Sequence, residues 1–203
     1  MSTDGAPPLD GLLVADFSRV LAGPLATMTL GDLGADVVKV EPPTGDDTRQ
    51  WGPPWSPATD EATYALAVNR NKRSLRLDLR DADDLALAHE LARRADVVVH
   101  NFRAGTARRL GLDHATVAAT NPRVVTCEVT GFGSHGAGAD LPGYDLLVQA
   151  TAGWMDVTGD ADGPPTKVGF ALADVLTGQQ AATAILAALR ARDRDGVGQR
   201  VEV

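Results

Sequence analysis

Short apolar runs rich in β-branched residues recur along the chain, and a polar or glycine-containing loop follows nearly every one of them. Runs of this length and composition are typical of buried β-strands. They predict strands at residues 12–17, 35–41, 74–79, 96–100, 124–129 and 199–203.

Helical patterns fill most of the intervals between these runs. Pro24 stands where the first turn of a helix accepts proline, and the pattern that it opens ends near Gly34. Further helices are expected at residues 82–94, near 105–110, after Asp113 and from Asp174 to about Arg192. Alternating strands and helices imply parallel pairing, so the predicted fold class is α/β: a Rossmann-like parallel sheet with flanking helices.

Three loops are too rich in glycine or proline to be regular elements. Residues 42–60 hold several prolines and two tryptophans and predict an ordered excursion, whereas residues 131–143 and 159–165 are rich in glycine. Long loops of this kind tend to carry function. Because ligands of open parallel sheets collect outside the carboxyl ends of the strands, we expect the cleft at these loops.

Composition and charge narrow the classes of function. The 203 residues are 44% hydrophobic and 23% charged, which fits one globular domain or slightly more, and neither a disordered nor a fibrous chain. The net charge of −8 opposes binding to nucleic acids and to anionic membranes. Residues 1–9 lack a leader pattern, and no run approaches the roughly 20 apolar residues that span a bilayer. We therefore expect a cytoplasmic protein without nucleic-acid or membrane partners.

The signatures of several enzyme classes are missing from the sequence. The first strand-to-helix turn, FSRVLAGP, lacks GxGxxG, and no serine stands in a GxSxG nucleophile elbow. The single cysteine, Cys127, cannot form an internal disulfide and is expected in the core. No histidine pair has metal-ligand spacing, so no metal site is expected, and only His135 is a candidate for proton transfer.

Asp174 is expected at the start of the last helix, where two interpretations are open. As an N-cap, its carboxylate would accept backbone N–H bonds, and sequence position alone favours this structural role. As a nucleophile, it would be kept ionised by the helix N-terminus and would attack a thioester carbonyl to form a mixed anhydride.

Basic residues gather in three places along this acidic chain. They could hold a phosphate-rich ligand, since arginine forms planar forked contacts with phosphate. From the residues alone, solvated surface positions are the favoured interpretation. The three groups are Arg70, Lys72 and Arg73; Arg76 and Arg80; and Arg103, Arg108 and Arg109.

A set of longer motifs resembles the family III CoA-transferases, which include formyl-CoA transferase, carnitine CoA-transferase and α-methylacyl-CoA racemase. The motifs DFSRVLAGP, LGDLGADVVKVEPP, NKRSLRLDLR, ADVVVHNFRAGTARRLGL and ALADVLTG follow the family pattern in order across the whole chain. The resemblance implies that residues 1–203 are the N-terminal portion of an incomplete large domain, with the small domain and the C-terminal return absent from this sequence.

The resemblance also implies roles for individual residues. Asp174 would be the nucleophile that accepts the acyl group, and Tyr144 stands where the racemases carry a histidine, which favours CoA transfer over racemisation. Pro42 departs from the family pattern, because some transferases carry an arginine there. The residues that would contact coenzyme A are Val20, Leu21, Leu77, Asp78, Leu79, Arg80, Asn101, Phe102, Arg103, Arg109 and Tyr144.

By this resemblance, coenzyme A is a substrate and no cofactor is permanently bound. The expected partners are an acyl-CoA and a carboxylic acid, together with a second copy in a homodimer or a complementing C-terminal half. Two alternatives remain at this point: a non-catalytic CoA-binding truncated fragment, and an α-methylacyl-CoA racemase.

Overall fold

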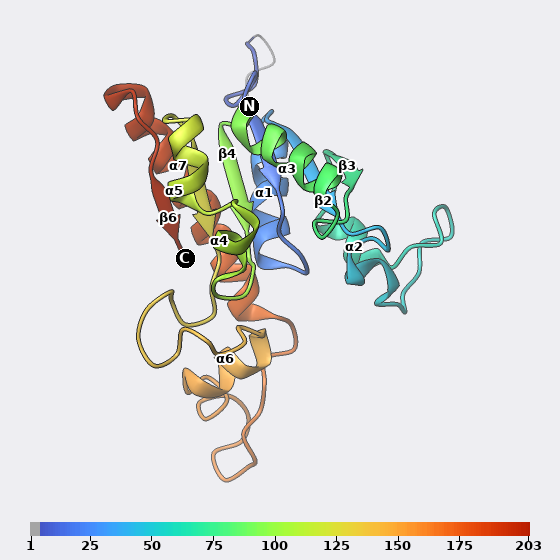
Figure 1. Ribbon diagram of the computed structural model, residues 1–203. Helices are drawn as coiled ribbons and strands as arrows, with labels where there is room; N and C mark the ends of the chain where they lie inside the picture. Colours follow the sequence, from blue (N-terminus) through green and yellow to red (C-terminus); the bar gives the residue numbers. More distant parts are fainter. Residues whose placement is uncertain (1–4) are drawn as a thin grey trace.

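The computed structural model describes residues 5–203, so part of the N-terminal segment for which no leader is expected, residues 1–4, lies outside the described residues. Its centre is a six-stranded sheet in the order β3-β2-β1-β4-β5-β6, in which every neighbouring pair is parallel (Figure 1). The predicted Rossmann-like parallel sheet is confirmed. Its strands are β1 (Leu13–Asp16), β2 (Asp36–Glu41), β3 (Lys72–Arg76), β4 (Val97–His100), β5 (Val125–Glu128) and β6 (Arg200–Glu202).

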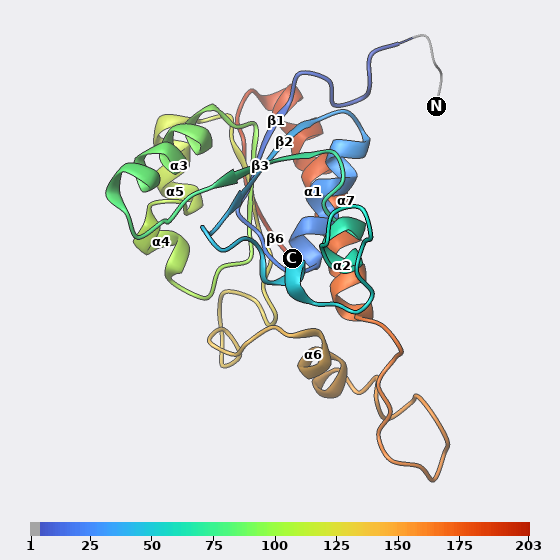
Figure 2. The ribbon, with the colours of Figure 1, turned by 90° about the vertical axis from the view of Figure 1, so that its right-hand side faces the viewer.

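Helices cover both faces of the sheet. One layer holds α1 and α7, and the other holds α3, α4 and α5 (Figure 2). Two-sided burial explains why the central strands read as continuous apolar runs instead of alternating patterns. The helices are α1 (Ala22–Asp32), α2 (Thr63–Ala67), α3 (Ala82–Arg94), α4 (Thr106–Leu110), α5 (His114–Thr120), α6 (Asp145–Thr151) and α7 (Leu172–Asp195), with the 3-10 helix η1 (Asp47–Gln50).

Alternate residues of the central strands feed two separate cores. Val97 and Val99 pack with the α1 and α7 layer, whereas Val98 between them packs with the α3 and α5 layer. Ile185 of α7 and Ala88 of α3 are fully buried in the two respective cores. The helices on both sides fix the sheet, so the loops at its carboxyl edge are carried by a rigid frame.

Among the described residues, one helix, α7, is long and apolar enough to cross a membrane. It packs in the core instead: Ala181, Ile185 and Leu189 are buried against α1 and the sheet. At Gly178 the two helices approach so closely that an added Cβ would lie 2.8 Å from the carbonyl oxygen of Ala22. The expectation that no segment approaches spanning length overlooked this helix, because its apolarity comes from many alanines.

Three local expectations differ from the structure. β3 begins earlier than the predicted 74–79, because its pairing with β2 already starts at Lys72, opposite Val37. It also ends earlier, and beyond its end the N–H of Asp78 donates to Asp84 Oδ2 of α3 at 2.7 Å. Helices α2 and α6 were not predicted, since they are too short to show a helical period. The excursion at 42–60 contains η1, which Asp46 caps by accepting a hydrogen bond from the N–H of Thr48.

Candidate active site

A cleft of about 1340 Å³ opens at the carboxyl edge of the sheet, where the cleft was expected. The loops after β1, β3, β4 and β5 line it together with α4 and the first turn of α7. Every residue that the family resemblance singled out lies on its wall. These are Val20, Leu21, Leu77, Asp78, Leu79, Arg80, Asn101, Phe102, Arg103, Arg109, Tyr144 and Asp174.

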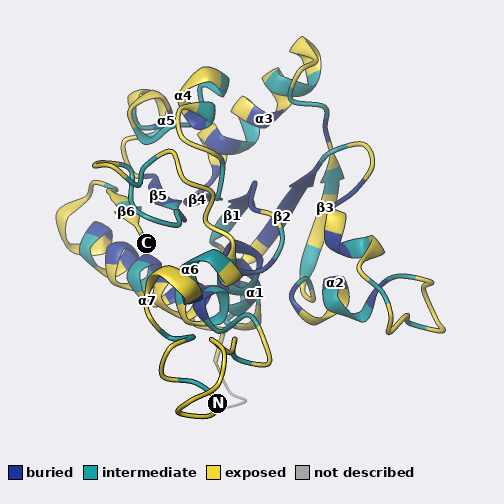
Figure 3. Cartoon of the chain, turned by 90° about the horizontal axis from the view of Figure 1, so that it is seen from below, coloured by how far each residue is buried: buried dark blue, intermediate teal, exposed yellow. Residues whose placement is uncertain are grey.

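Asp174 lies within the first turn of α7, not in front of it. The N-cap of this helix is Ala171, whose side chain makes no capping bond, so the interpretation of Asp174 as the N-cap is wrong. Seen from below (Figure 3), α6 lies over the start of α7 and turns an exposed surface to solvent. Asp174 is half-buried between α6 and the cleft.

Asp145 is the first residue of α6, and it caps the N-terminus of another helix, α7. Its Oδ1 accepts hydrogen bonds from the N–H of Ala173 at 2.8 Å and from that of Asp174 at 3.4 Å. The buried Gln149 donates to Asp145 Oδ2 at 2.6 Å and holds the carboxylate in place. The backbone donors expected to stabilise the charge of Asp174 are therefore taken by a second carboxylate.

Burial, together with the neighbouring charge of Asp145, raises the pKa of Asp174 to about 6. The expected cause, stabilisation of the charge by the helix terminus, is therefore wrong, because the pKa is raised and not lowered. Desolvation destabilises the charged form, and the helix dipole does not compensate because Asp145 occupies its free donors. At neutral pH the group is still mostly ionised, yet it is poorly solvated, which suits a nucleophile.

Arginines form a basic wall of the cleft. Arg19, Arg103, Arg108 and Arg109 are exposed and line the cleft, and within residues 5–203 none of the four takes part in an ion pair. Arg80 also lines it but pairs with Asp78 at 2.8 Å. Unpaired guanidinium groups on a chain of net charge −8 make this wall a local site for anions.

The first basic group of the sequence lies elsewhere. Arg70 pairs with Asp32, Lys72 with Asp16, and Arg73 with Asp36, and none of these basic residues lines the cleft. Arg76 does not line it either. Because acidic neighbours already pair with Arg70, Lys72 and Arg73, the fold favours the alternative interpretation that these three residues hold no ligand.

Two of the predicted contacts have well-defined surroundings within the protein. The ring of Phe102 stacks on that of His100, with centroids 5.1 Å apart and planes at 17°, and burial lowers the pKa of His100. Asn101 contacts the loop after β1: its Nδ2 donates to the carbonyl oxygen of Arg19 at 2.8 Å, and its Oδ1 accepts from the N–H of Arg19 at 2.9 Å. Phe102 and Asn101 therefore reach the cleft as parts of a fixed wall.

A polar cluster that sequence reasoning missed stands where β6 ends. Ser134 Oγ donates to Glu202 Oε2 at 2.8 Å and lies 2.8 Å from His135 Nδ1. Arg200 joins Glu128 and Glu202 through ion pairs of 2.6 and 2.8 Å. Ser134 and His135 line the cleft, but the distance in sequence between 134 and 202 gave no signal for this contact.

The two ends of the glycine-rich loop at residues 131–143 meet each other. A Cβ added to Gly131 would lie 2.2 Å from the Cα of Gly143, so the two backbones cross almost in contact. Only glycine permits such an approach. At these two positions the glycines serve the closure of the loop.

Two tyrosines flank the carboxylates. Tyr144 is the N-cap of α6 and is 64% exposed on the wall of the cleft. Burial, followed by the charges of Asp174 and Asp145, raises the pKa of Tyr64 to about 12, so its phenol lies within electrostatic reach of both. The ring of Trp51 meets that of Tyr64 edge-on at 5.5 Å. Sequence reasoning missed Tyr64, because α2 showed no helical pattern.

Cys127 is fully buried in β5, and burial raises the pKa of its thiol to about 12. Its predicted place in the core is confirmed. Within residues 5–203, no group of three histidine, cysteine, aspartate or glutamate side chains is arranged to hold a metal ion.

Known proteins are similar to this chain over nearly its whole described length. The model of the CoA-transferase family III matches residues 9–203. The succinate–glutarate CoA-transferase of Agrobacterium fabrum is 46% identical over 97% of this chain and 50% of its own length. The acetyl-CoA:oxalate CoA-transferase of Acetobacter aceti is also 46% identical, again over 97% of this chain and 50% of its own.

A solved structure agrees with these sequences. The crystal structure of a CAIB/BAIF family protein from Brucella suis superposes with a TM-score of 0.93 at 46% identity, covering 97% of this chain and 53% of that one. The chain thus spans about half the length of the relatives that it matches. A family match over nearly the entire chain, joined to the parallel sheet and its cleft, shows that this chain belongs to the CoA-transferase family III.

Proposed function

We propose that the protein transfers coenzyme A between carboxylic acids through an acyl anhydride at Asp174. The observation that carries the proposal is one cleft that combines two kinds of group. It is lined by a poorly solvated carboxylate with a pKa of about 6 and by four arginines that form no ion pair within residues 5–203. A thioester with a polyanionic nucleotide tail needs both features at once.

The nucleotide end of coenzyme A would lie against the basic wall. Its phosphates would meet Arg103 and Arg109, and the shelf formed by Leu77 to Arg80 together with Phe102 would take the adenosine. The pantetheine arm would then run past Val20 and Leu21 and bring the thioester carbonyl to Asp174. In this pose the side chain of Tyr144 borders the acyl group, and all of these residues line the same cleft.

The chemistry follows from the carboxylate. Asp174 Oδ attacks the thioester carbonyl, the C–S bond breaks, and the coenzyme A thiolate leaves with the electron pair. The thiolate attacks the aspartyl carbonyl of the mixed anhydride and releases the first acid as a carboxylate. A second carboxylate attacks the aspartyl thioester, forms a new mixed anhydride and releases the thiolate. The thiolate then attacks the acyl carbonyl of this anhydride, which gives the new acyl-CoA and restores the Asp174 carboxylate.

Residues 1–203 would form part of the large domain of a longer enzyme, and further polypeptide would cover the cleft. The relatives are about twice as long as this chain. Several large apolar side chains near Asp174 are exposed, which supports a covering segment from a complementing C-terminal half or from the second copy of a homodimer. They are Leu141, Tyr144, Leu146, Phe170 and Leu176. We propose a cytoplasmic location, in keeping with a lone buried thiol.

The anhydride can be trapped directly. Incubating the full-length protein with an acyl-CoA and then with hydroxylamine is expected to leave a hydroxamate on Asp174, which peptide mass spectrometry locates. The variant Asp174→Asn serves as the control and should remain unmodified. A folded protein that binds coenzyme A and turns it over without any mark on Asp174 would refute the mechanism.

A second candidate is a CoA-binding protein without transferase activity, which the exposed arginines that line the cleft would support by themselves. Calorimetry separates the two candidates. Binding of coenzyme A with no turnover of any tested acyl-CoA and acid pair by the full-length protein would support binding alone, whereas turnover excludes it.

A further inference from the structure

The loop that joins β1 to α1 has an unusual backbone at the point where it faces the cleft. Val20 has a φ of +70°, a left-handed conformation that a β-branched residue rarely adopts. Val20 and its neighbour Leu21 line the same cleft as Asp174. A conformation of this kind persists only where surrounding contacts impose it.

One set of contacts acts on the loop from the side of β4. The side-chain amide of Asn101 forms two hydrogen bonds with the backbone of Arg19, one with its N–H at 2.9 Å and one with its carbonyl oxygen at 2.8 Å. Both backbone polar groups of Arg19, the N–H and the carbonyl oxygen, are therefore fixed immediately before Val20. This clamp sets the direction in which the chain enters the left-handed residue.

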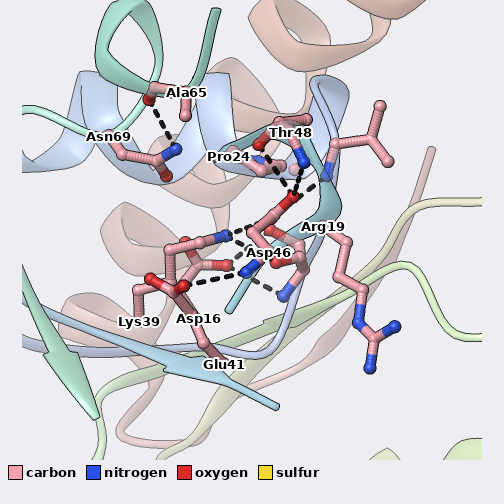
Figure 4. A network of polar contacts seen from close by, with 12 residues as sticks. Asp16, Arg19, Pro24, Lys39, Glu41, Asp46, Thr48, Ala65 and Asn69 are labelled. Atoms are coloured by element: carbon pink, nitrogen blue, oxygen red, sulfur yellow. Dashed lines mark hydrogen bonds and ion pairs between the residues drawn. The ribbon is translucent and has the colours of Figure 1, made fainter. Parts of the chain in front are cut away.

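A second set of contacts reaches the loop from the buried ion pair of Lys39 and Asp46 (Figure 4). Lys39 Nζ lies 3.0 Å from Asp46 Oδ2, and the two side chains are 2% and 1% exposed. Lys39 also donates to the carbonyl oxygen of Ser18 at 2.9 Å, while Asp46 Oδ2 accepts from the N–H of Val20 at 3.4 Å. The pair thus holds the loop at one residue before the Asn101 clamp and at one residue after it.

The ion pair is itself fixed by its neighbours. Asp46 Oδ1 accepts hydrogen bonds from the N–H and the Oγ1 of Thr48, at 3.0 and 2.8 Å. The N–H of Asp46 donates to Glu41 Oε2 at 2.9 Å. A second buried pair, Asp16 with Lys72 at 3.0 Å, holds the start of the loop, because Asp16 Oδ1 accepts from the N–H of Ser18.

Burying so many charges is costly, and a packed apolar core at the same place is often equally stable or more stable. Apolar packing has no direction, however, and would not select the left-handed conformation of Val20 over the alternatives. Directional hydrogen bonds from Lys39, Asp46 and Asn101 do select it. The network therefore has a purpose that stability alone does not explain.

We infer that Lys39 and Asp46, with Asn101, are positioning residues that hold Val20 and Leu21 where the thioester end of coenzyme A meets Asp174. The inference rests on the proposed transfer function. The loop leads into α1, which packs against α7 at Gly178, so a shift of the loop changes its distance from the first turn of α7. Displacing reacting groups by even one ångström lowers rates by about a hundredfold.

The test removes the ion pair as a unit in the full-length protein. Lys39→Met with Asp46→Asn deletes both charges and keeps the side-chain volumes, and the amide oxygen introduced by Asp46→Asn still accepts from Thr48. The matched control, Arg192→Met with Asp96→Asn, deletes an ion pair with a buried arginine and a partly exposed carboxylate that does not line the cleft. Kinetics with an acyl-CoA, calorimetry with 3′,5′-adenosine diphosphate, and hydrogen exchange at the amide of Val20 are measured on both.

The expected result is a split between chemistry and nucleotide binding. The Lys39 and Asp46 double variant should lose about a hundredfold in kcat, keep its affinity for 3′,5′-adenosine diphosphate within about twofold, and exchange the Val20 amide about tenfold faster. The control should match the unmodified protein in all three. Equal kcat and equal exchange in the two double variants would overturn the inference.

Two other outcomes have a different meaning from equal kcat and equal exchange in the two double variants. If the unmodified protein binds coenzyme A but turns over no acyl-CoA, the proposed function fails, and unchanged Val20 exchange in the double variant then removes the positioning role as well. If the double variant does not fold, Val20→Gly tests the loop without touching a charge. That change frees the backbone and should lower kcat about tenfold at unchanged nucleotide affinity. Unchanged kcat would again overturn the inference.

Discussion

The two edges of the sheet each hold an ion pair, one partly exposed and one fully buried, and the two pairs hold different parts of the fold in place. At the amino edge, Arg192 of α7 pairs with Asp96 at 2.8 Å, and Asp96 Oδ2 accepts from the N–H of Leu13 at 2.9 Å. These contacts join one helix to two strands and line no cleft. At the carboxyl edge, the Lys39 and Asp46 pair holds an irregular loop that does line the cleft.

The difference teaches what buried charge does in this fold. Where regular elements meet, apolar packing already fixes their positions, and one pair with a partly exposed carboxylate suffices. Where a loop must hold a disfavoured conformation beside a reactive group, several mutually bonded charges replace apolar packing. Variants at the two edges are therefore expected to differ in stability, in pH dependence and in KM, in that order of size.

The largest expected contrast is in the free energy of unfolding. Lys39→Met leaves Asp46 buried without its counter-ion and should cost about 3–5 kcal/mol. Arg192→Met leaves Asp96, which is 29% exposed and reachable by water, and should cost only about 1–2 kcal/mol. Urea unfolding of both single variants measures the difference. Equal losses would contradict the view that the two pairs sit in different environments.

The next contrast depends on pH and concerns Asp174. Its pKa in the folded protein is about 6, above the ordinary value of 3.8, so the folded state binds more protons between these values and stability falls as the pH rises through that range. Asp174→Asn should therefore stabilise the protein by about 1–2 kcal/mol at pH 7, after allowance for partial exposure, with the gain vanishing near pH 4.

Thermal or urea unfolding of parent and variant across this range gives the comparison. Asp96→Asn, at the other edge, is the control and should show no such gain at pH 7. A constant difference between Asp174→Asn and the parent from pH 4 to pH 8 would show that the pKa of Asp174 is not raised by the fold.

The smallest expected contrast concerns the exposed arginines. Arg103→Ala or Arg109→Ala should raise KM for an acyl-CoA about threefold to tenfold at low salt, with a smaller effect at high salt, because each removes one screened contact with a phosphate. Arg123→Ala removes an exposed guanidinium outside the cleft and should leave KM unchanged. The same rise in all three variants would point to net charge instead of a site.

Much of the fold could be predicted from the sequence, because its signals are local. The helix expected at 82–94 has those bounds in the structure, and the central strands lie within a residue or two of their predicted limits. Fold class followed from strand and helix alternation. Short elements such as α2 and α6 escaped, since their stability comes from tertiary contacts that no short window of sequence contains.

The position of the candidate site residues on the cleft wall was predictable, but their physical surroundings were not. Motifs identified the residues of the cleft wall, whereas the surroundings of Asp174 depend on Asp145, which is remote in sequence and becomes a neighbour only after folding. Lys72 illustrates the same limit. In the sequence it belongs to a basic run, but in the fold it is buried beside Asp16, and burial lowers its pKa to about 8.

The close contact between the backbones of Gly131 and Gly143 separates the loop at the entrance of the cleft from the frame that carries Asp145 and Asp174. Because the two ends of the intervening loop meet, the segment between them is a closed appendage whose length does not alter how β5 connects to α6. Apart from Ser134, which is bonded to Glu202, residues of this segment can therefore be exchanged while the frame that carries Asp145 and Asp174 stays in place. The entrance of the cleft and the surroundings of the Asp174 carboxylate can accordingly be altered separately.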